Sequence, residues 1–336
     1  MNKVLYIILI SLFSLTVFSC TKSDDSKTAT TDNTTSSSDD SSDNSSSSSV
    51  PRGFVAVGNE GTIVKSTDNG SSFDNVTSPG GWDLGGVVFG NTTLVAVGQA
   101  GVVFSSTDNG STWKKWMDIV NSSHFNGVTF GNDIFVAVAD DGIIIRSTNG
   151  STWNNVTSLT ANANHIIGVT FGNNTFVAVG YSGNIIRSTD NGSSWDNATS
   201  PTANDLRGVT FGNNTFVAVG ASGNIFRSTD NGSSFDNATS PTANDLSGIT
   251  FANNTFVAVG DYIVRSTDNG SSFDNATSGT NHLVGANHLQ GVGFGNNTFV
   301  AVGGSGTIVR STDNGTNWDN VTSPTGKRLY GVTFSE

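Results

Sequence analysis

A frame reading Ser-Thr-Asp-Asn-Gly-x-x-Trp/Phe recurs about every forty residues along the chain, and this repeat constrains the fold more than any other feature. Between copies, short runs of Val, Ile, Phe and Thr alternate with Gly, Asn and Asp, which is the pattern of strands joined by tight turns. A strand-rich repeat of this length is typical of propeller blades. The sequence therefore predicts an all-β, seven-bladed β-propeller, with box copies that begin at Ser66, Ser106, Ser147, Ser188, Ser228, Ser266 and Ser311.

Each repeat contains four strand-like segments, as the stretch from Leu206 to Asp245 illustrates, and this predicts four-stranded antiparallel blades. We name the strands A to D from the axis outward. The repeats begin with a B strand at Phe54 and end with an A strand at Gly331–Phe334. We therefore expect the C-terminal strand to complete the first blade and close the ring, because the first blade would otherwise keep an unpaired strand edge.

The N-terminal part of the chain differs from the repeats. Residues 1–20 combine a basic start, an apolar run and the pair Ser19-Cys20, which resembles a bacterial lipoprotein signal peptide with Cys20 as the lipidated residue. Residues 21–50 are almost entirely Ser, Thr, Asp and Asn, so we expect a disordered tether before the propeller of residues 51–336. This organisation predicts a lipid-anchored protein of the cell envelope, at the outer membrane and facing the periplasm or the cell exterior.

The composition argues against several classes of function. The formal net charge of −12 makes nucleic acid an unexpected partner. With one cysteine, the chain has no disulfide framework and no cysteine-based zinc or redox site, and we expect no cofactor. His124 and His165 come from neighbouring repeats, but spacing provides no third ligand, so no metal site is predicted.

The recurrent frame resembles the Asp-box, or BNR repeat, of sialidases and other propellers, and the resemblance covers residues 54 to 334. The array is also similar to the photosystem II assembly factor-like propellers. The resemblance puts the box turn between strands C and D, away from the ligand face, where its carboxylate accepts hydrogen bonds from its own turn. In the third copy Asn149-Gly150 replaces the Asp. We predict a structural role for Asp68, Asp108, Asp190, Asp230, Asp268 and Asp313.

Sialidase chemistry is not expected from this chain. It requires an arginine triad, a Tyr activated by Glu and an acidic proton donor, whereas the only glutamates are Glu60 and Glu336. Arg187 and its equivalents face Asp196 and its equivalents across a hairpin, which favours cross-strand ion pairs. We predict no catalytic residue and favour a non-enzymatic binding or scaffold module. The alternative is a glycoside hydrolase or lyase with another carboxylate set, drawn from Asp140, Asp141, Asp205 and Asp261.

Residues that break the repeat are the candidates for ligand binding, because a site in a ring of equal blades arises from their differences. One glycine in each A strand marks an equivalent position: Gly86, Gly127, Gly168, Gly208, Gly248, Gly291 and Gly331. The position three residues before it reads Asp83, His124, His165, Asp205, Asp245, His288 and Arg328. The position two residues after that one should surround the opening of the central channel. It reads Gly85, Asn126, Ile167, Arg207, Ser247, Gln290 and Tyr330.

Aromatic residues outside the repeat pattern add Trp82, Tyr181 and Tyr262 to the same face. We expect this D-to-A loop face to bind a protein or glycan partner, because propeller loops commonly carry ligand sites. The alternative for the Asp/His positions is that each polar side chain caps the D-to-A turn of its blade.

Overall fold

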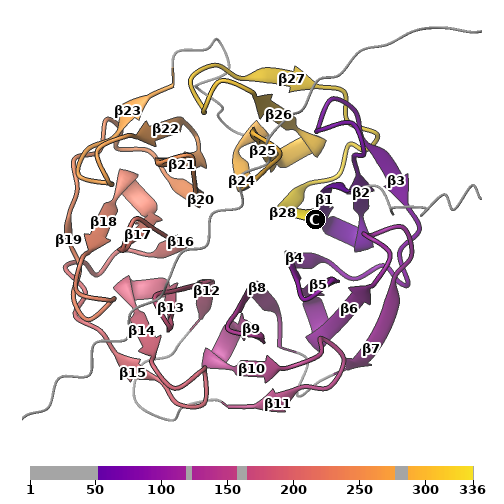
Figure 1. Ribbon diagram of the computed structural model, residues 1–336, viewed down its shortest axis with the longest axis horizontal. Helices are drawn as coiled ribbons and strands as arrows, with labels where there is room; N and C mark the ends of the chain where they lie inside the picture. The colour runs from indigo at the N-terminus through magenta and orange to yellow at the C-terminus, as the bar shows by residue number, and fades with distance from the viewer. Residues whose placement is uncertain (1–51, 119–122, 157–164, 277–286, 336) are drawn as a thin grey trace, which may run out of the picture. The chain divides into compact units, whose positions relative to one another are not determined.

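The computed structural model describes residues 52–335, except for 119–122, 157–164 and 277–286. The described residues form seven antiparallel sheets of four strands each, as predicted, and the sheets surround a central axis (Figure 1). Blade 1 contains the strands β28, β1, β2 and β3, and blades 2 to 7 follow in chain order. Within the described residues, no helix has the length and apolar character needed to cross a membrane.

The A strands line the axis and the B strands lie next to them in each blade (Figure 1). The A strands are β4 (Leu84–Gly90), β8 (Phe125–Gly131), β12 (Ile166–Gly172), β16 (Leu206–Gly212), β20 (Leu246–Ala252), β24 (Leu289–Gly295) and β28 (Leu329–Ser335). The B strands are β1 (Gly53–Gly58), β5 (Thr93–Gly98), β9 (Ile134–Ala139), β13 (Thr175–Gly180), β17 (Thr215–Gly220), β21 (Thr255–Gly260) and β25 (Thr298–Gly303).

The C and D strands form the outer part of each blade. The C strands are β2 (Ile63–Lys65), β6 (Val102–Ser106), β10 (Ile144–Ser147), β14 (Ile185–Ser188), β18 (Ile225–Ser228), β22 (Ile263–Ser266) and β26 (Ile308–Ser311). The D strands are β3 (Asp74–Val76), β7 (Lys114–Asp118), β11 (Asn154–Asn155), β15 (Asp196–Asn197), β19 (Asp236–Asn237), β23 (Asp274–Asn275) and β27 (Asp319–Val321).

A short 3-10 turn joins strands B and C in every blade except blade 6. These turns are η1 (Asn59–Gly61), η2 (Gln99–Gly101), η3 (Asp140–Gly142), η4 (Tyr181–Gly183), η5 (Ala221–Gly223) and η7 (Gly304–Gly306). The B-to-C turns lie at the same end of the blades as the D-to-A loops, because successive strands are antiparallel. The Asp-box turns join strands C and D at the opposite end.

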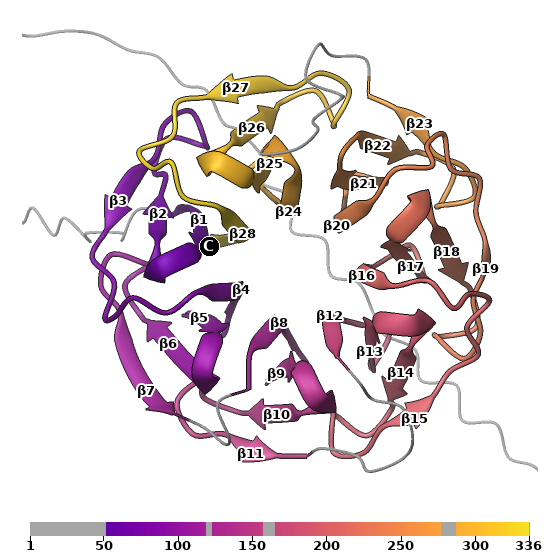
Figure 2. The ribbon, with the colours of Figure 1, turned by 180° about the vertical axis from the view of Figure 1, so that it is seen from behind.

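The C-terminal strand closes the ring, which confirms the predicted closure. Strand β28 pairs antiparallel with β1, with Phe334 opposite Phe54 and Val332 opposite Ala56 (Figure 2). The Phe54 and Phe334 rings lie 5.0 Å apart, edge to face. The fully buried Ser335 hydroxyl donates to the Gly53 carbonyl oxygen at 3.1 Å. The first and last described strands therefore share one sheet.

The hydrophobic core lies between neighbouring blades. Strand β17 reads Thr-Phe-Val-Ala-Val-Gly and is buried along its whole length. This strand belongs to blade 5. Its Val217 and Val219 pack against blade 6, and its Phe216 and Ala218 pack against blade 4. Both faces of a blade are thus covered by apolar neighbours, which explains why the B strands are continuous apolar runs. The core depends on the closed ring, because each blade packs against two others.

The box carboxylates organise the C-to-D turns. Asp68 accepts hydrogen bonds from the Ser71 and Ser72 backbone N–H groups at 3.0 and 2.9 Å, and from the Ser66 hydroxyl at 2.8 Å. In the third copy the side-chain oxygen of Asn149 accepts from the Thr152 N–H at 2.9 Å. These turns carry the C strand into the D strand, on the face opposite the D-to-A loops.

We expect acid to weaken these boxes. Partial burial raises the pKa of each carboxyl, but hydrogen bonds from the box serines outweigh it and lower the pKa to about 2 in Asp68, Asp190, Asp230 and Asp268. Because these values lie below those of the unfolded chain, the stability they contribute is present above about pH 4 and lost as the pH falls through 2. A variant with these four residues changed to Asn should show a flatter fall in melting temperature between pH 4 and 2. A fall as steep as that of the wild type would contradict this role.

The predicted cross-strand ion pairs are wrong, although their register is right. Arg187 lies opposite Asp196, and the equivalent pairs align in the same way. Within the described residues, however, no ion pair forms between them. The guanidinium of Arg187 instead donates to the Ser233 hydroxyl, and the ammonium of Lys65 donates to Ser111 at 2.9 Å. Both serines lie in the box of the next blade, so these long side chains join neighbouring blades.

Candidate functional site

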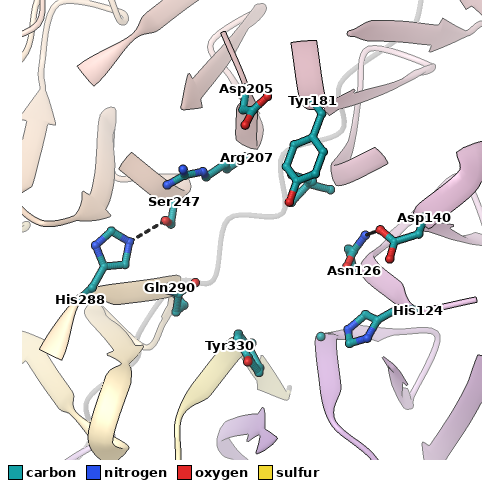
Figure 3. Close-up of a pocket in the computed structure, with 12 residues that line it drawn as sticks. His124, Asn126, Asp140, Tyr181, Asp205, Arg207, Ser247, His288, Gln290 and Tyr330 are labelled. Atoms are coloured by element: carbon teal, nitrogen blue, oxygen red, sulfur yellow. Dashed lines mark hydrogen bonds between the residues drawn. The ribbon is translucent and has the colours of Figure 1, made fainter. Parts of the chain in front are cut away.

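A cavity of about 510 Å³ opens at the centre of the face that carries the D-to-A loops (Figure 3). Its inner ring comes from one structural device that is repeated in every blade. In blade 5 the pairing of β16 with β17 shifts between Leu206 and Gly208, which leaves Arg207 as the extra residue of a β-bulge. A bulge redirects the extra side chain out of the regular alternation of the strand. In each blade this residue lines the cavity, and the seven are Gly85, Asn126, Ile167, Arg207, Ser247, Gln290 and Tyr330.

The Asp/His positions support this ring through their backbone. In every blade the carbonyl oxygen at this position accepts a hydrogen bond from the first residue of the B-to-C connection, at 2.7–3.1 Å. Leu206, which follows Asp205, is fully buried, as are its counterparts. A backbone hydrogen bond and a buried apolar side chain therefore both fix the start of the A strand. The bulge residue that follows keeps its direction toward the axis.

Three of the aspartates also use their side chains as caps. Asp83, Asp205 and Asp245 each accept, through Oδ1, the backbone N–H of the middle residue of the preceding blade's 3-10 turn, at 2.7 to 2.9 Å. These middle residues have left-handed backbone, with φ of 55° at Ser182 and 59° at Ser222. Asp245 additionally binds Arg207 at 2.9 Å. Burial of Asp245 raises its pKa, but the Ser222 N–H and the Arg207 charge outweigh it and lower the pKa.

Two of the histidines pair with an aspartate of the preceding blade. His165 Nδ1 lies 3.1 Å from Asp140 Oδ1, and His288 Nδ1 lies 2.6 Å from Asp261 Oδ1. Among the seven repeats, only these two B-to-C connections begin with Asp, and in both the next repeat supplies a His. This covariation inside one chain is the signal that could have predicted both pairs. We predicted roles for the carboxylates and for the histidines separately.

The predicted ligand-face residues separate into two groups. The cavity is lined by His124, Tyr181, Asp205, Arg207, His288, Gln290 and Tyr330. Outside the lining are Trp82, Asp83, His165, Tyr262 and Arg328. That either group binds a ligand stays a prediction. The cavity also takes in Asp140, which the sequence analysis considered only as a carboxylate of the hydrolase alternative.

The aromatic candidates occupy different environments. Trp82 is half-buried against Phe104, with ring centroids 6.5 Å apart, and the Lys115 ammonium lies 3.8 Å from the ring centroid. Tyr262 is half-buried against the core between blades 5 and 6. Tyr181 is 43% exposed and reaches into the cavity (Figure 3). A stacking platform for a ligand therefore fits Tyr181 and Tyr330 better than Trp82.

The cavity wall is polar and carries charges of both signs. Arg207 supplies the positive charge on one side, and Asp140 and Asp205 lie among the other lining residues. Asn126 donates to Asp140 Oδ1 at 3.0 Å and to the Ile166 carbonyl oxygen at 2.9 Å. In the described part of the chain, no three His, Cys, Asp or Glu side chains converge as metal ligands would. The lining can offer hydrogen bonds, one cation and two phenol rings to a ligand.

Comparison with known proteins identifies the family. Residues 87–336 match the family described as photosynthesis system II assembly factor YCF48. The solved structure of YCF48 from Cyanidioschyzon merolae is 20% identical, with a TM-score of 0.60 over 76% of this chain and 90% of that chain. A structure of YCF48 bound to D1 peptide is 16% identical, with a TM-score of 0.57 over 80% of this chain and 84% of that one.

The same fold is shared more widely. The computationally designed Ika8 protein is 14% identical, with a TM-score of 0.57 over 82% of this chain and 86% of that chain. No curated protein matches the chain. At these identities the solved structures show the fold alone, whereas the family match covers most of the propeller.

The predicted location at the cell envelope, on the outer membrane and facing the periplasm or the cell exterior, is wrong on these comparisons. The matching family is named for photosystem II assembly, and both similar solved structures are of YCF48, the protein for which that family is described. The expectation rested on the leader alone, and an apolar leader indicates export without specifying the final membrane. Cys20 lies outside the described residues, so its lipidation stays a prediction. The chain belongs to the photosynthesis system II assembly factor YCF48 family of Asp-box propellers.

Proposed function

We propose that this protein is a binding module that holds a segment of a partner protein at the mouth of its central channel. The observation that carries the proposal is the ring of seven bulge residues, which differ between blades and line one cavity of about 510 Å³. Specific ligand sites usually have volumes of about 300–1,000 Å³. The structure of the relative YCF48 bound to D1 peptide supports a peptide as the class of ligand.

The chemistry of the lining fits a peptide. A peptide backbone presents N–H donors and carbonyl acceptors, and the amides of Asn126 and Gln290 can pair with both kinds of group. Arg207 can bind a carboxylate of the peptide, and the phenol rings of Tyr181 and Tyr330 provide apolar surface with a polar end. The ligand is expected to engage several blades at once, because these residues come from five different blades.

The other candidate functions have less support. A glycan could stack on Tyr181 and Tyr330, which a glycan array with the same protein would test. The glycoside hydrolase alternative needs carboxylates that can act on a sugar. Asp205 instead caps the 3-10 turn of the preceding blade, and Asp140 and Asp261 each bind a histidine.

The binding site can be tested with a displayed peptide library. Peptides selected on the wild-type protein are synthesised, and their dissociation constants are measured by fluorescence polarisation. The double variant Arg207→Ala/Tyr330→Ala should bind at least about tenfold more weakly, which corresponds to roughly 1.4 kcal/mol. The control is Lys327→Ala, which removes an exposed cation on the same face that pairs with Glu60 at 2.7 Å, outside the cavity.

The control variant should bind within about twofold of the wild type, because an exposed ion pair contributes little. The proposal is wrong if the double variant retains wild-type affinity for the selected peptides. It is equally wrong if Lys327→Ala loses as much affinity as the double variant, since binding would then depend on the loop surface instead of the cavity.

A further inference from the structure

A serine, a histidine and an aspartate form a continuous hydrogen-bonded chain at the cavity wall. The Ser247 hydroxyl lies 2.8 Å from His288 Nε2, and His288 Nδ1 lies 2.6 Å from Asp261 Oδ1. The side chains of His288 and Asp261 are only 17% and 23% exposed. Ser247 and His288 both line the cavity, and Figure 3 shows the bond between them. The hydroxyl is therefore within reach of a bound molecule, while its two partners are sheltered.

The fold builds this arrangement between blades 6 and 7, where one connection differs from its counterparts. In blade 6, only Asp261 and Tyr262 separate β21 from β22, so the 3-10 turn of the other blades is missing. The Asp261 N–H donates to the Asp245 carbonyl oxygen at 3.1 Å, which holds Asp261 beside the loop that enters its own blade. His288 belongs to the loop that enters blade 7, where it precedes β24, and the bulge in β20 directs Ser247 toward it. Two adjacent blades thus supply the three groups.

The chain contains an internal comparison at blades 3 and 4. Asn126, Asp140 and His165 occupy the positions of Ser247, Asp261 and His288. There the bulge residue is an amide that donates to Asp140 at 3.0 Å, and none of the hydroxyls of the described residues is bound to the histidine. The Asp–His pair therefore occurs at both places in the described residues, whereas a hydroxyl bound to the histidine Nε2 occurs only where blade 6 meets blade 7.

We propose that Ser247 is a nucleophile activated by His288 and Asp261, and that the cavity hydrolyses carboxylic esters with small acyl groups, an activity beyond the binding function. With its proton on Nδ1 and donated to Asp261, His288 accepts the Ser247 proton at Nε2. Ser247 Oγ forms a bond to the ester carbonyl carbon, and the ester C–O bond breaks as His288 protonates the leaving alcohol. Water, deprotonated by His288, then releases the acid and restores Ser247.

The residues on either side of Ser247 suit the charge that this reaction develops. Arg207 and Gln290 are the bulge residues of the two flanking blades, and both line the same cavity wall as Ser247 (Figure 3). Their N–H groups can donate to the oxyanion of the tetrahedral intermediate, a role that arginine and amide side chains fill in other hydrolytic sites. Asp245 binds the Arg207 guanidinium through Nη2 at 2.9 Å, and a guanidinium carries five N–H donors in all.

The test uses a fluorophosphonate probe, which reacts with activated serines, on the full chain and its variants. We expect one adduct, located on Ser247 by peptide mass spectrometry, and hydrolysis of p-nitrophenyl acetate. Ser247→Ala should remove the adduct, and His288→Gln should slow labelling and hydrolysis at least about a hundredfold. The matched control is His165→Gln, which alters the other Asp–His pair and should leave both rates within about twofold.

The outcomes distinguish activation from simple exposure. Labelling at Ser247 that His288→Gln slows, in a variant whose melting temperature stays within a few degrees of the wild type, supports the proposal. Labelling at other serines only, equal rates for the wild type and His288→Gln, or equal losses for His288→Gln and His165→Gln would overturn it. Asp261→Asn provides a second variant in case His288→Gln does not fold, and it too should slow labelling. None of these results depends on whether the cavity binds peptides.

Discussion

A protein that lacks Gly331–Glu336 is expected to lose most of its stability. The deletion removes nearly all of β28, so β1 loses the partner that pairs with it from Gly53 to Val57. It also removes Val332 and Phe334 from the core between blades 1 and 7. Loss of two such apolar side chains costs roughly 5 kcal/mol in the free energy of unfolding, before any backbone pairing is counted. The melting temperature should fall by more than about 10 °C.

Circular dichroism melts of the purified protein measure this effect. A synthetic peptide of residues 329–335, added in excess, should restore part of the loss, because the exposed edge of β1 can pair with an added strand. The single variant Phe334→Ala should lie between the wild type and the truncation. A truncated protein that melts within about 2 °C of the wild type would show that closure does not depend on β28.

The substitution Gly223→Val is expected to destabilise the fold through the backbone. Gly223 has φ of +68°, and a Cβ there would lie 2.0 Å from the Thr242 carbonyl oxygen. The clash is with backbone, so the D-to-A loop that leads into blade 6 would have to move. Left-handed strain and overpacking each cost about 1–3 kcal/mol, which together lower the melting temperature by several degrees.

The neighbouring residue provides the control. Ser222→Ala should change the free energy of unfolding by no more than about 0.5 kcal/mol, because Ala100 occupies the same place in η2 with φ of 57°. Chemical denaturation of both variants measures the difference. Equal stability of Gly223→Val and Ser222→Ala would show that the D-to-A loop is not held against the turn.

Much of the fold could be predicted because local sequence patterns specify its turns and strands. Turn residues such as Asn69-Gly70 require left-handed backbone, and both have positive φ as their residue types suggest. The alternation of apolar runs and turns specified four strands in each blade, and counting the repeats specified seven blades. Closure followed because Phe54 opens a B strand with no A strand before it. The hydrogen-bond partner of Arg187 could not be predicted in this way, because the Ser233 hydroxyl that accepts from it lies in another blade.

The candidate site was only partly predictable. The repeat position that faces the channel could be recognised from its variability, and all seven of its residues line the cavity. Nothing in the spacing indicated that a β-bulge redirects them, since a bulge depends on the partner strand. Trp82 was indistinguishable from Tyr181 as an exposed aromatic, yet contacts with Phe104 and Lys115 half-bury it.

The sequence by itself determined the repeat, the number of blades, the strand that closes them and the face on which the repeat varies. These depend on interactions within one blade or on counting, and both are visible along the chain. Only the tertiary structure decided which side chains meet, such as Ser247 with His288 and His288 with Asp261. Such contacts cross from one blade to the next, where closing the ring brings together residues that lie far apart in the sequence.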